Sequence, residues 1–171
     1  MKTILILISS SLLLLSCEKK LSEEQHRVYF EHYAINYAWG FSYVHWVIDD
    51  EGNVRTLHKK DSDIQLNSNN INSATSVFDS IIYKIDKNEL EKYIALILPA
   101  AKGEIDSTAQ TRADFGTLVF NCFWYKEMTT TYATILLSQM SDNSDKINVD
   151  SNAVKIVNWL KEIHSKIYSD L

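Results

Sequence analysis

Bulky and small side chains alternate in the N-terminal third of the chain. The bulky residues occupy odd positions, namely Tyr33, Ile35, Tyr37, Trp39, Phe41, Tyr43, His45 and Val47. Small residues such as Ala34, Ala38 and Gly40 lie between them. A period of two predicts a β-strand with one bulky face. Turn-forming residues at 49–53 precede a second β-prone run at 54–59, which predicts a hairpin.

A second hairpin is predicted at residues 116–125 and 130–139. The polar segments 61–74 and 141–148 lack apolar periodicity and predict loops. The apolar run 77–85 fits either a strand or a helical turn.

Two helices follow from apolar spacing. One begins at Asp86, with Glu89 in its first turn, and is expected to end or kink near Leu98 because Pro99 disfavours helical geometry before it. The second begins at Asp150 or Ser151 as N-cap. Its apolar residues recur at steps of three and four, at Ala153, Ile156, Val157, Leu160, Ile163 and Ile167.

These elements predict an α+β fold with two layers. We expect an antiparallel sheet of about four strands in two hairpins, with two amphipathic helices packed on one face. The chain divides into a signal peptide at 1–16, a lipidated N-terminus and tether at 17–27, and a single globular domain at 28–171.

The signal peptide is indicated by Lys2, a run of mostly apolar residues from 4 to 15, and then Ser16-Cys17. The apolar run is too short for a membrane-spanning helix and is typical of an export signal. A cysteine directly after a small residue resembles the lipobox of bacterial lipoproteins. That resemblance implies cleavage before Cys17 and attachment of acyl chains to it. We therefore expect the chain to be anchored in the cell envelope, with the outer membrane favoured over the inner membrane and the domain facing the periplasm or the surface.

Short motifs in the remainder are similar to those of small uncharacterised lipoproteins of Bacteroidetes-type bacteria. They are Trp39-Gly40, Ile48-Asp49 with Gly52 and Val54, Asp114 with Gly116, and Trp159-Leu160. This resemblance implies no activity.

The charge and the cysteine content of the chain disfavour nucleic acid as a partner and an intrachain disulfide. The chain carries 17 basic and 22 acidic residues, and removal of the signal peptide with Lys2 changes the net charge from −5 to −6. This acidity disfavours nucleic acid as a partner. Cys122 is the sole cysteine left beside Cys17, so no intrachain disulfide is expected.

The bulky face of the first strand is the candidate ligand-binding site. Its residues Tyr37, Trp39, Phe41, Tyr43 and His45 offer a stacking platform for sugar rings or a peptide. The alternative is that the helices cover this face and make it part of the core.

No catalytic or metal site is predicted. The five histidines show neither a His-Glu-x-x-His motif nor a ligand spacing, and Cys122 lies in an apolar strand as a small buried residue. The acidic turn at 49–53 lacks the EF-hand pattern, because Gly52 is its fourth residue and Lys60 its twelfth. We expect no cofactor.

These observations favour a membrane-anchored lipoprotein with a non-catalytic binding or accessory domain and a protein or glycan partner in the envelope. Two alternatives remain. One is an immunity or inhibitor protein whose acidic residues at 49–51 and 142–145 face a basic toxin or enzyme. The other is a small periplasmic hydrolase that uses His45 with an acidic partner.

Overall fold

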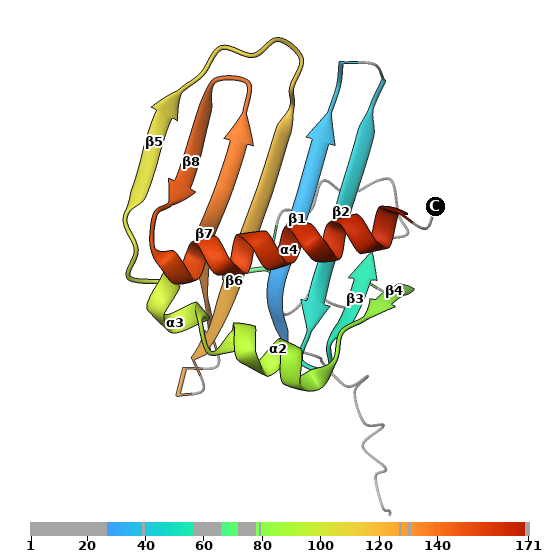
Figure 1. Cartoon of the computed structure of the whole chain (residues 1–171), viewed down its shortest axis with the longest axis vertical. Coiled ribbons are helices and arrows are strands. Elements are labelled where there is room, and N and C mark those ends of the chain that lie inside the picture. The colour runs from blue at the N-terminus through green and yellow to red at the C-terminus, as the bar shows by residue number, and fades with distance from the viewer. Residues whose placement is uncertain are drawn as a thin grey trace, which may run out of the picture.

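A computed structural model describes residues 27–38, 40–56, 66–71, 78, 80–126, 128–129 and 131–169 (Figure 1). The strands of these residues form one sheet in the order β4-β3-β2-β1-β6-β7-β8-β5. Every neighbouring pair is antiparallel. The strands are β1 (Val28–Asn36), β2 (Ser42–Asp49), β3 (Asn53–Thr56), β4 (Ser80–Lys84), β5 (Ile105–Ala109), β6 (Thr117–Lys126), β7 (Thr131–Ser141) and β8 (Ser144–Asn148).

The predicted sheet of about four strands is therefore wrong, because the described sheet has eight. Part of the error lies in the segment 141–148, which was expected to be a loop. Its second half forms β8, which pairs with β7 on one side and with β5 on the other. Polar residues such as Asp145 and Lys146 can extend a sheet by backbone hydrogen bonds alone, so no apolar alternation marks such a strand.

The long strand expected from Tyr33 to Val47 is two strands, β1 and β2, joined by a turn at residues 37–41. Gly40 has φ of 109°, a conformation that glycine adopts far more readily than other residues. The alternation continues through the turn because Tyr33 pairs with His45 and Ile35 with Tyr43. Odd positions of both strands thus share one face of the sheet.

In the described part of the chain, the other face is covered by the helices α2 (Lys87–Ile94), α3 (Ile97–Ala100) and α4 (Ser151–Ser169). The long α4 runs across the strands (Figure 1). Asp86 caps α2 by accepting from the backbone amides of Asn88 and Glu89, as predicted. Asp150 accepts from the amide of Asn152 at the start of α4. Pro99 does not set the end of α2, which stops at Ile94; it lies within α3.

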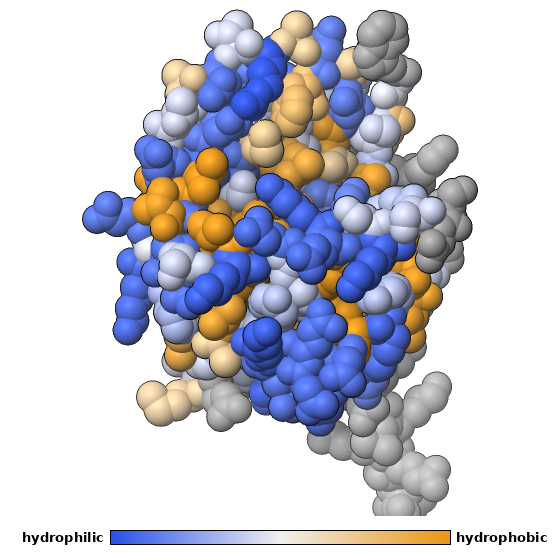
Figure 2. Space-filling view, in the orientation of Figure 1, coloured by the Kyte–Doolittle hydropathy of each residue, from blue (hydrophilic) through white to orange (hydrophobic). Residues whose placement is uncertain are grey.

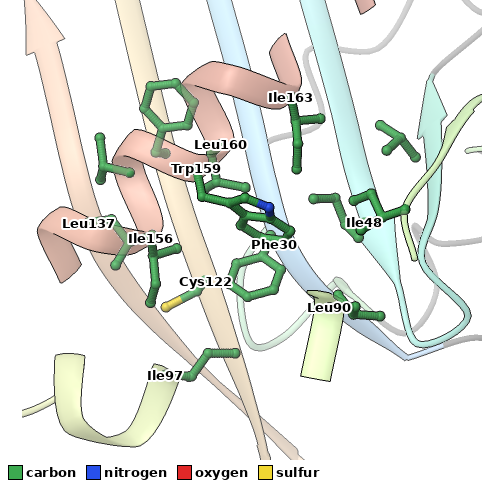
Figure 3. Packing of buried hydrophobic residues seen from close by; sticks show 14 of the residues in the cluster. Phe30, Ile48, Leu90, Ile97, Cys122, Leu137, Ile156, Trp159, Leu160 and Ile163 are labelled. Atoms are coloured by element: carbon green, nitrogen blue, oxygen red, sulfur yellow. The ribbon is translucent and has the colours of Figure 1, made fainter. Parts of the chain in front are cut away.

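The main core lies between α4 and the sheet. Ile156, Leu160 and Ile163 project from α4 toward β1, β2 and β6 (Figure 3). Trp159 packs its ring edge to face with Phe30, at 5.2 Å between ring centroids. The same indole stacks on Tyr93 of α2 at 4.1 Å and donates a hydrogen bond to Glu89. Trp159 therefore connects α4, on which it lies, and α2 to β1. The outer side of α4 is mainly hydrophilic (Figure 2).

A second apolar cluster lies on the opposite face of the sheet. Its buried residues are Val28, Val47, Leu66, Ile71, Phe78, Phe123 and Tyr132. The helices thus pack on even-numbered residues of β1 and β2, such as Phe30 and Trp46, and not on the bulky odd-numbered face that the sequence suggested they might cover. That face is packed instead by residues from the connection between β3 and β4.

Candidate functional site: an aromatic tip and a buried histidine

The β1–β2 turn places a group of aromatic rings at one end of the sheet. Tyr37 is 66% exposed and Phe41 is 51% exposed, and their ring centroids lie 5.6 Å apart. Phe41 is nearly parallel to Tyr43, at 6.4 Å and 14°. We refer to Tyr37, Phe41 and Tyr43 as the aromatic tip. Of the five predicted ligand-binding residues, Trp39 lies outside the described residues, and His45 is buried below the tip.

The hydroxyl of Tyr43 is held by His45. Its oxygen lies 2.6 Å from Nδ1 of His45, and Nε2 of the same ring lies 2.8 Å from Oε1 of Glu31. An ionised carboxylate only accepts hydrogen bonds, so a neutral His45 carries its proton on Nε2. Nδ1 then accepts from Tyr43, which leaves the lone pairs of the phenol oxygen directed away from the imidazole.

Glu31 completes this network inside the sheet. Glu31 is fully buried. Its carboxylate oxygens also accept hydrogen bonds from the backbone amide of Leu66 at 3.1 Å and from Nδ2 of Asn121 at 2.8 Å. Burial and the charge of Glu31 raise the pKa of the neighbouring Tyr33 to about 12. The Glu31 carboxylate thus receives hydrogen bonds from three donors, as a buried polar group requires. The network is an ordered part of the folded structure.

Sequence reasoning missed Glu31 and Asn121. Glu31 belongs to the same odd-numbered register as Tyr33, two residues earlier, so extending the alternation by one step would have included it. Asn121 gave no local signal, because β6 is brought beside β1 only by the sheet, where Asn121 pairs with Glu31.

The network is poorly suited to direct catalysis by His45. The side chains of His45 and Glu31 are both fully buried, and both imidazole nitrogens are hydrogen-bonded. A general base must reach the proton that it removes. Among the described hydrogen bonds of His45, the one to the Tyr43 hydroxyl is the link toward the surface. The geometry instead fixes the position of the Tyr43 side chain and makes its hydroxyl the donor in the hydrogen bond to His45.

The acidic residues considered for a basic partner are partly used within the fold. Asp49 is fully buried and accepts from Arg55 at 2.6 Å. Asp145 accepts two bonds of 2.6 Å from Arg112, which lower the pKa of that carboxyl. Asp142 accepts from the backbone amides of Phe115 and Gly116 at 2.7 and 3.0 Å.

The remaining candidates lie apart from the tip. Cys122 is fully buried in the main core, where burial raises the pKa of its thiol. His32 lies on the helix-covered face, and His164 on α4 packs against it. His26 and His58 lie outside the described residues. Within the described part of the chain, no group of three His, Cys, Asp or Glu side chains is arranged to hold a metal.

Comparisons with protein families, curated proteins and solved structures find no match to this chain. Among the helices of the described residues, none has the length and apolar content needed to cross a membrane. The predicted signal peptide at 1–16, Cys17 and residues 18–26 of the predicted tether lie outside the described residues.

Proposed function

We propose that the chain is a bacterial envelope lipoprotein, anchored by acyl chains on Cys17, whose domain is a non-catalytic binding module. In this proposal the aromatic tip is the contact surface, and its partner is another protein of the envelope. The anchor rests on the lipobox resemblance, and the binding role rests on the geometry of the tip.

The observation that carries the binding role is the buried support beneath an exposed aromatic surface. Rings of this size are normally buried, yet Tyr37 and Phe41 are more than half exposed. Beneath them, Glu31 is buried at a desolvation cost and directs its hydrogen bonds through His45 to Tyr43. A core packed by apolar side chains alone would avoid this cost. The network therefore supports a role in positioning Tyr43 for a contact.

The chemistry of the tip favours a protein over a glycan. Tyrosine and other aromatic residues dominate the binding energy of protein interfaces. Sugar recognition needs fixed polar groups beside the rings, but two such groups near the tip are engaged internally. The side chain of Asn36 accepts from the amide of Ala38 at 2.8 Å, and the Tyr43 hydroxyl is bonded to His45.

The anchor is tested by metabolic labelling with a palmitate analogue. We expect the wild-type chain to incorporate label and to fractionate with membranes, and Cys17→Ala to lose both properties. Acyl chains contribute about 0.8 kcal/mol per buried methylene, and more than one chain gives lasting attachment. Unchanged labelling in Cys17→Ala would contradict the anchor without affecting the binding role.

The binding role is tested by affinity capture from solubilised envelopes of the source cells. We expect wild type to retain a specific protein that the double variant Tyr37→Ala/Phe41→Ala loses. Ile81→Ala is the matched control, because Ile81 is 54% exposed, close to the 51% of Phe41, but lies on the edge strand β4. Equal recovery by all three proteins, or none by any, would contradict the proposal.

A further inference from the structure

The strand β5 lies at an edge of the sheet and is exposed along its whole length. In the described part of the chain, β5 is the last strand of the order and pairs with β8 on its inner side (Figure 1). All five of its residues, Ile105–Ala109, are exposed. Proteins usually block edge strands with proline, lysine or a bulge. β5 has neither proline nor lysine, and its register with β8 is regular. Its outer side is therefore open to another strand.

The hydrogen bonds at the two ends of β5 show which backbone groups face outward. The amide of Val149 donates to the carbonyl of Glu104 at 3.0 Å, and the amide of Gln110 donates to the carbonyl of Asn143 at 2.9 Å. Both pairs continue the register of β5 with β8. Because hydrogen-bonded positions alternate along an antiparallel pair, the even-numbered residues of β5 direct their backbone groups toward β8. The odd-numbered residues direct theirs outward. These residues are Ile105, Ser107 and Ala109.

Two copies of β5 are complementary along these outward groups. A two-fold axis makes such a pair antiparallel, and its hydrogen bonds join odd-numbered residues. With Ser107 opposite its own counterpart, Ile105 lies opposite Ala109 of the second copy, so all the outward residues are paired. Asp106 then lies opposite Thr108 of the second copy. The register centred on Asp106 would instead place two carboxylates directly opposite each other, which is destabilising.

The side chains of β5 fit the register centred on Ser107. Ile105 is 43% exposed, and in this register it packs beside the small side chain of Ala109. Asp106 is the one charged residue of β5. The carboxylate of Asp106 faces the hydroxyl of Thr108, which can donate a hydrogen bond to it. The strand is thus complementary to itself in its backbone groups, in side-chain size and in charge.

We infer that a second copy of this chain binds along β5, in an antiparallel two-fold register centred on Ser107. The two sheets then form one continuous sheet, and the two-fold axis perpendicular to it keeps the helices of both copies on the same face. A contact through one short strand is small, so the dimer is a weak one that dissociates in the micromolar range. The inference rests on β5 and does not require the aromatic tip to bind a partner.

Sedimentation equilibrium from micromolar to submillimolar concentration tests this inference. The protein is the proposed mature chain, residues 17–171 with Cys17→Ser, which keeps every described strand and helix. We expect wild type to be in a monomer–dimer equilibrium, and Ser107→Pro to weaken the dimer at least about tenfold, because proline removes the central outward N–H. Proline is tolerated where an edge strand faces solvent. Ser107→Ala is the matched control, since it keeps this N–H and should dimerise as wild type does.

The register is tested by charge. Thr108→Lys places an ammonium opposite Asp106 of the second copy at two symmetric points, so we expect the dimer to tighten about fivefold. The double variant Asp106→Lys/Thr108→Lys places like charges there and should weaken the dimer about fivefold relative to wild type. Both variants make the chain less acidic, so a general effect of net charge would shift both in the same direction.

Urea unfolding of each variant verifies that it is folded. A wild-type chain that stays monomeric at submillimolar concentration, including one whose β5 binds other extended peptides, would overturn the inference. So would a dimer that Ser107→Pro leaves intact, or a shift of the same sign in the two lysine variants. Loss of partner capture at the aromatic tip would leave the inference unaffected.

Discussion

The β1–β2 hairpin buries one histidine on each of its two faces, and the surroundings of the two rings differ. His32 lies on the helix-covered face, stacked 4.5 Å from Phe120, and its Nε2 has no hydrogen-bond partner among the described residues. Only Nδ1 is bonded, to the carbonyl of Val119. On the other face His45 uses both nitrogens, toward Glu31 and Tyr43.

The two histidines therefore have different roles: His32 packs as a ring in the core, and His45 positions Tyr43. Around His32 the imidazole serves as a flat ring among Trp46, Phe120 and His164, and burial holds it neutral. Around His45 each polar atom has a partner, and the chain of hydrogen bonds ends at a ring on the surface. His32 therefore belongs to the ring packing of the helix-covered face, whereas His45 connects the buried Glu31 to the aromatic tip.

The largest expected effect comes from breaking the polar network. Glu31→Ala leaves the Nε2 proton of His45, the Asn121 amide and the Leu66 amide without their acceptor. We expect the free energy of unfolding to fall by about 3–5 kcal/mol, as for other buried ionic groups that lose one partner. Urea unfolding measures this loss, with Glu31→Gln as the shape-matched control. A fall below about 1 kcal/mol would show that the network is not closed as described.

On the helix-covered face, the contribution of His32 to the free energy of unfolding should depend on pH. Burial, and secondarily the neighbouring His164, lower the pKa of His32 to about 3 from the usual 6.5. The unfolded chain therefore binds a proton at His32 as the pH falls below 6.5, while the folded chain does not until about pH 3. The stability that the neutral, buried His32 contributes is fully present above pH 6.5. It is lost on acidification, and the free energy of unfolding is lower by about 2 kcal/mol at pH 5.

The pH effect is isolated by comparing wild type with His32→Phe. Other titrating groups near the ring, His164 and Tyr168 on α4 and His45 on β2, stay in both proteins. Burial lowers the pKa of His164 as well, so it acts in the same direction in both. We expect the variant to lose about 2 kcal/mol less than wild type between pH 7 and pH 5. Parallel pH profiles would contradict a neutral, buried His32.

A smaller effect is expected from Tyr43→Phe. The ring remains in the aromatic tip, but the 2.6 Å hydrogen bond to His45 is lost. We expect the free energy of unfolding to fall by about 1 kcal/mol. Partner capture should weaken much more than this stability change explains, because the hydroxyl group that His45 positions is absent from the variant. If the Tyr43→Phe variant captured the partner as well as the wild-type protein does, the network would have no role in binding.

The smallest effect on stability is expected at the tip itself. Tyr37→Ala removes a ring that is 66% exposed, so the free energy of unfolding should change by no more than about 0.5 kcal/mol. Thermal or urea unfolding measures the change, with Ile81→Ala alongside. A loss above about 2 kcal/mol would indicate that Tyr37 is part of the packing and would remove the distinction between tip and core.

The parts of the fold with their own periodicity were predictable from the sequence. The spacing from Ala153 to Ile167 predicted α4, and residues 116–125 and 130–139 predicted the β6–β7 hairpin. β8 was missed because its polar residues join the sheet through backbone bonds, and the turn between β1 and β2 was missed because the alternation continues across it.

The candidate site was predictable only in part. Tyr37, Phe41, Tyr43 and His45 follow from the alternation, which identifies their shared face. Which helices or loops cover that face depends on the order of strands in the sheet. The partner of His45 likewise depends on register, because Glu31 is 14 residues away and Asn121 is 90 residues from Glu31. Contacts over such separations leave no local pattern.

Photo-crosslinking in intact cells tests the aromatic tip most directly. A photoreactive phenylalanine analogue replaces Phe41 in one strain and Ile81 in another, two positions of similar exposure on different parts of the surface. We predict one discrete crosslinked protein from position 41, lost when Tyr43→Phe is added, and none from position 81. Crosslinking that is equal at both positions, or confined to position 81, would contradict a binding site at the tip.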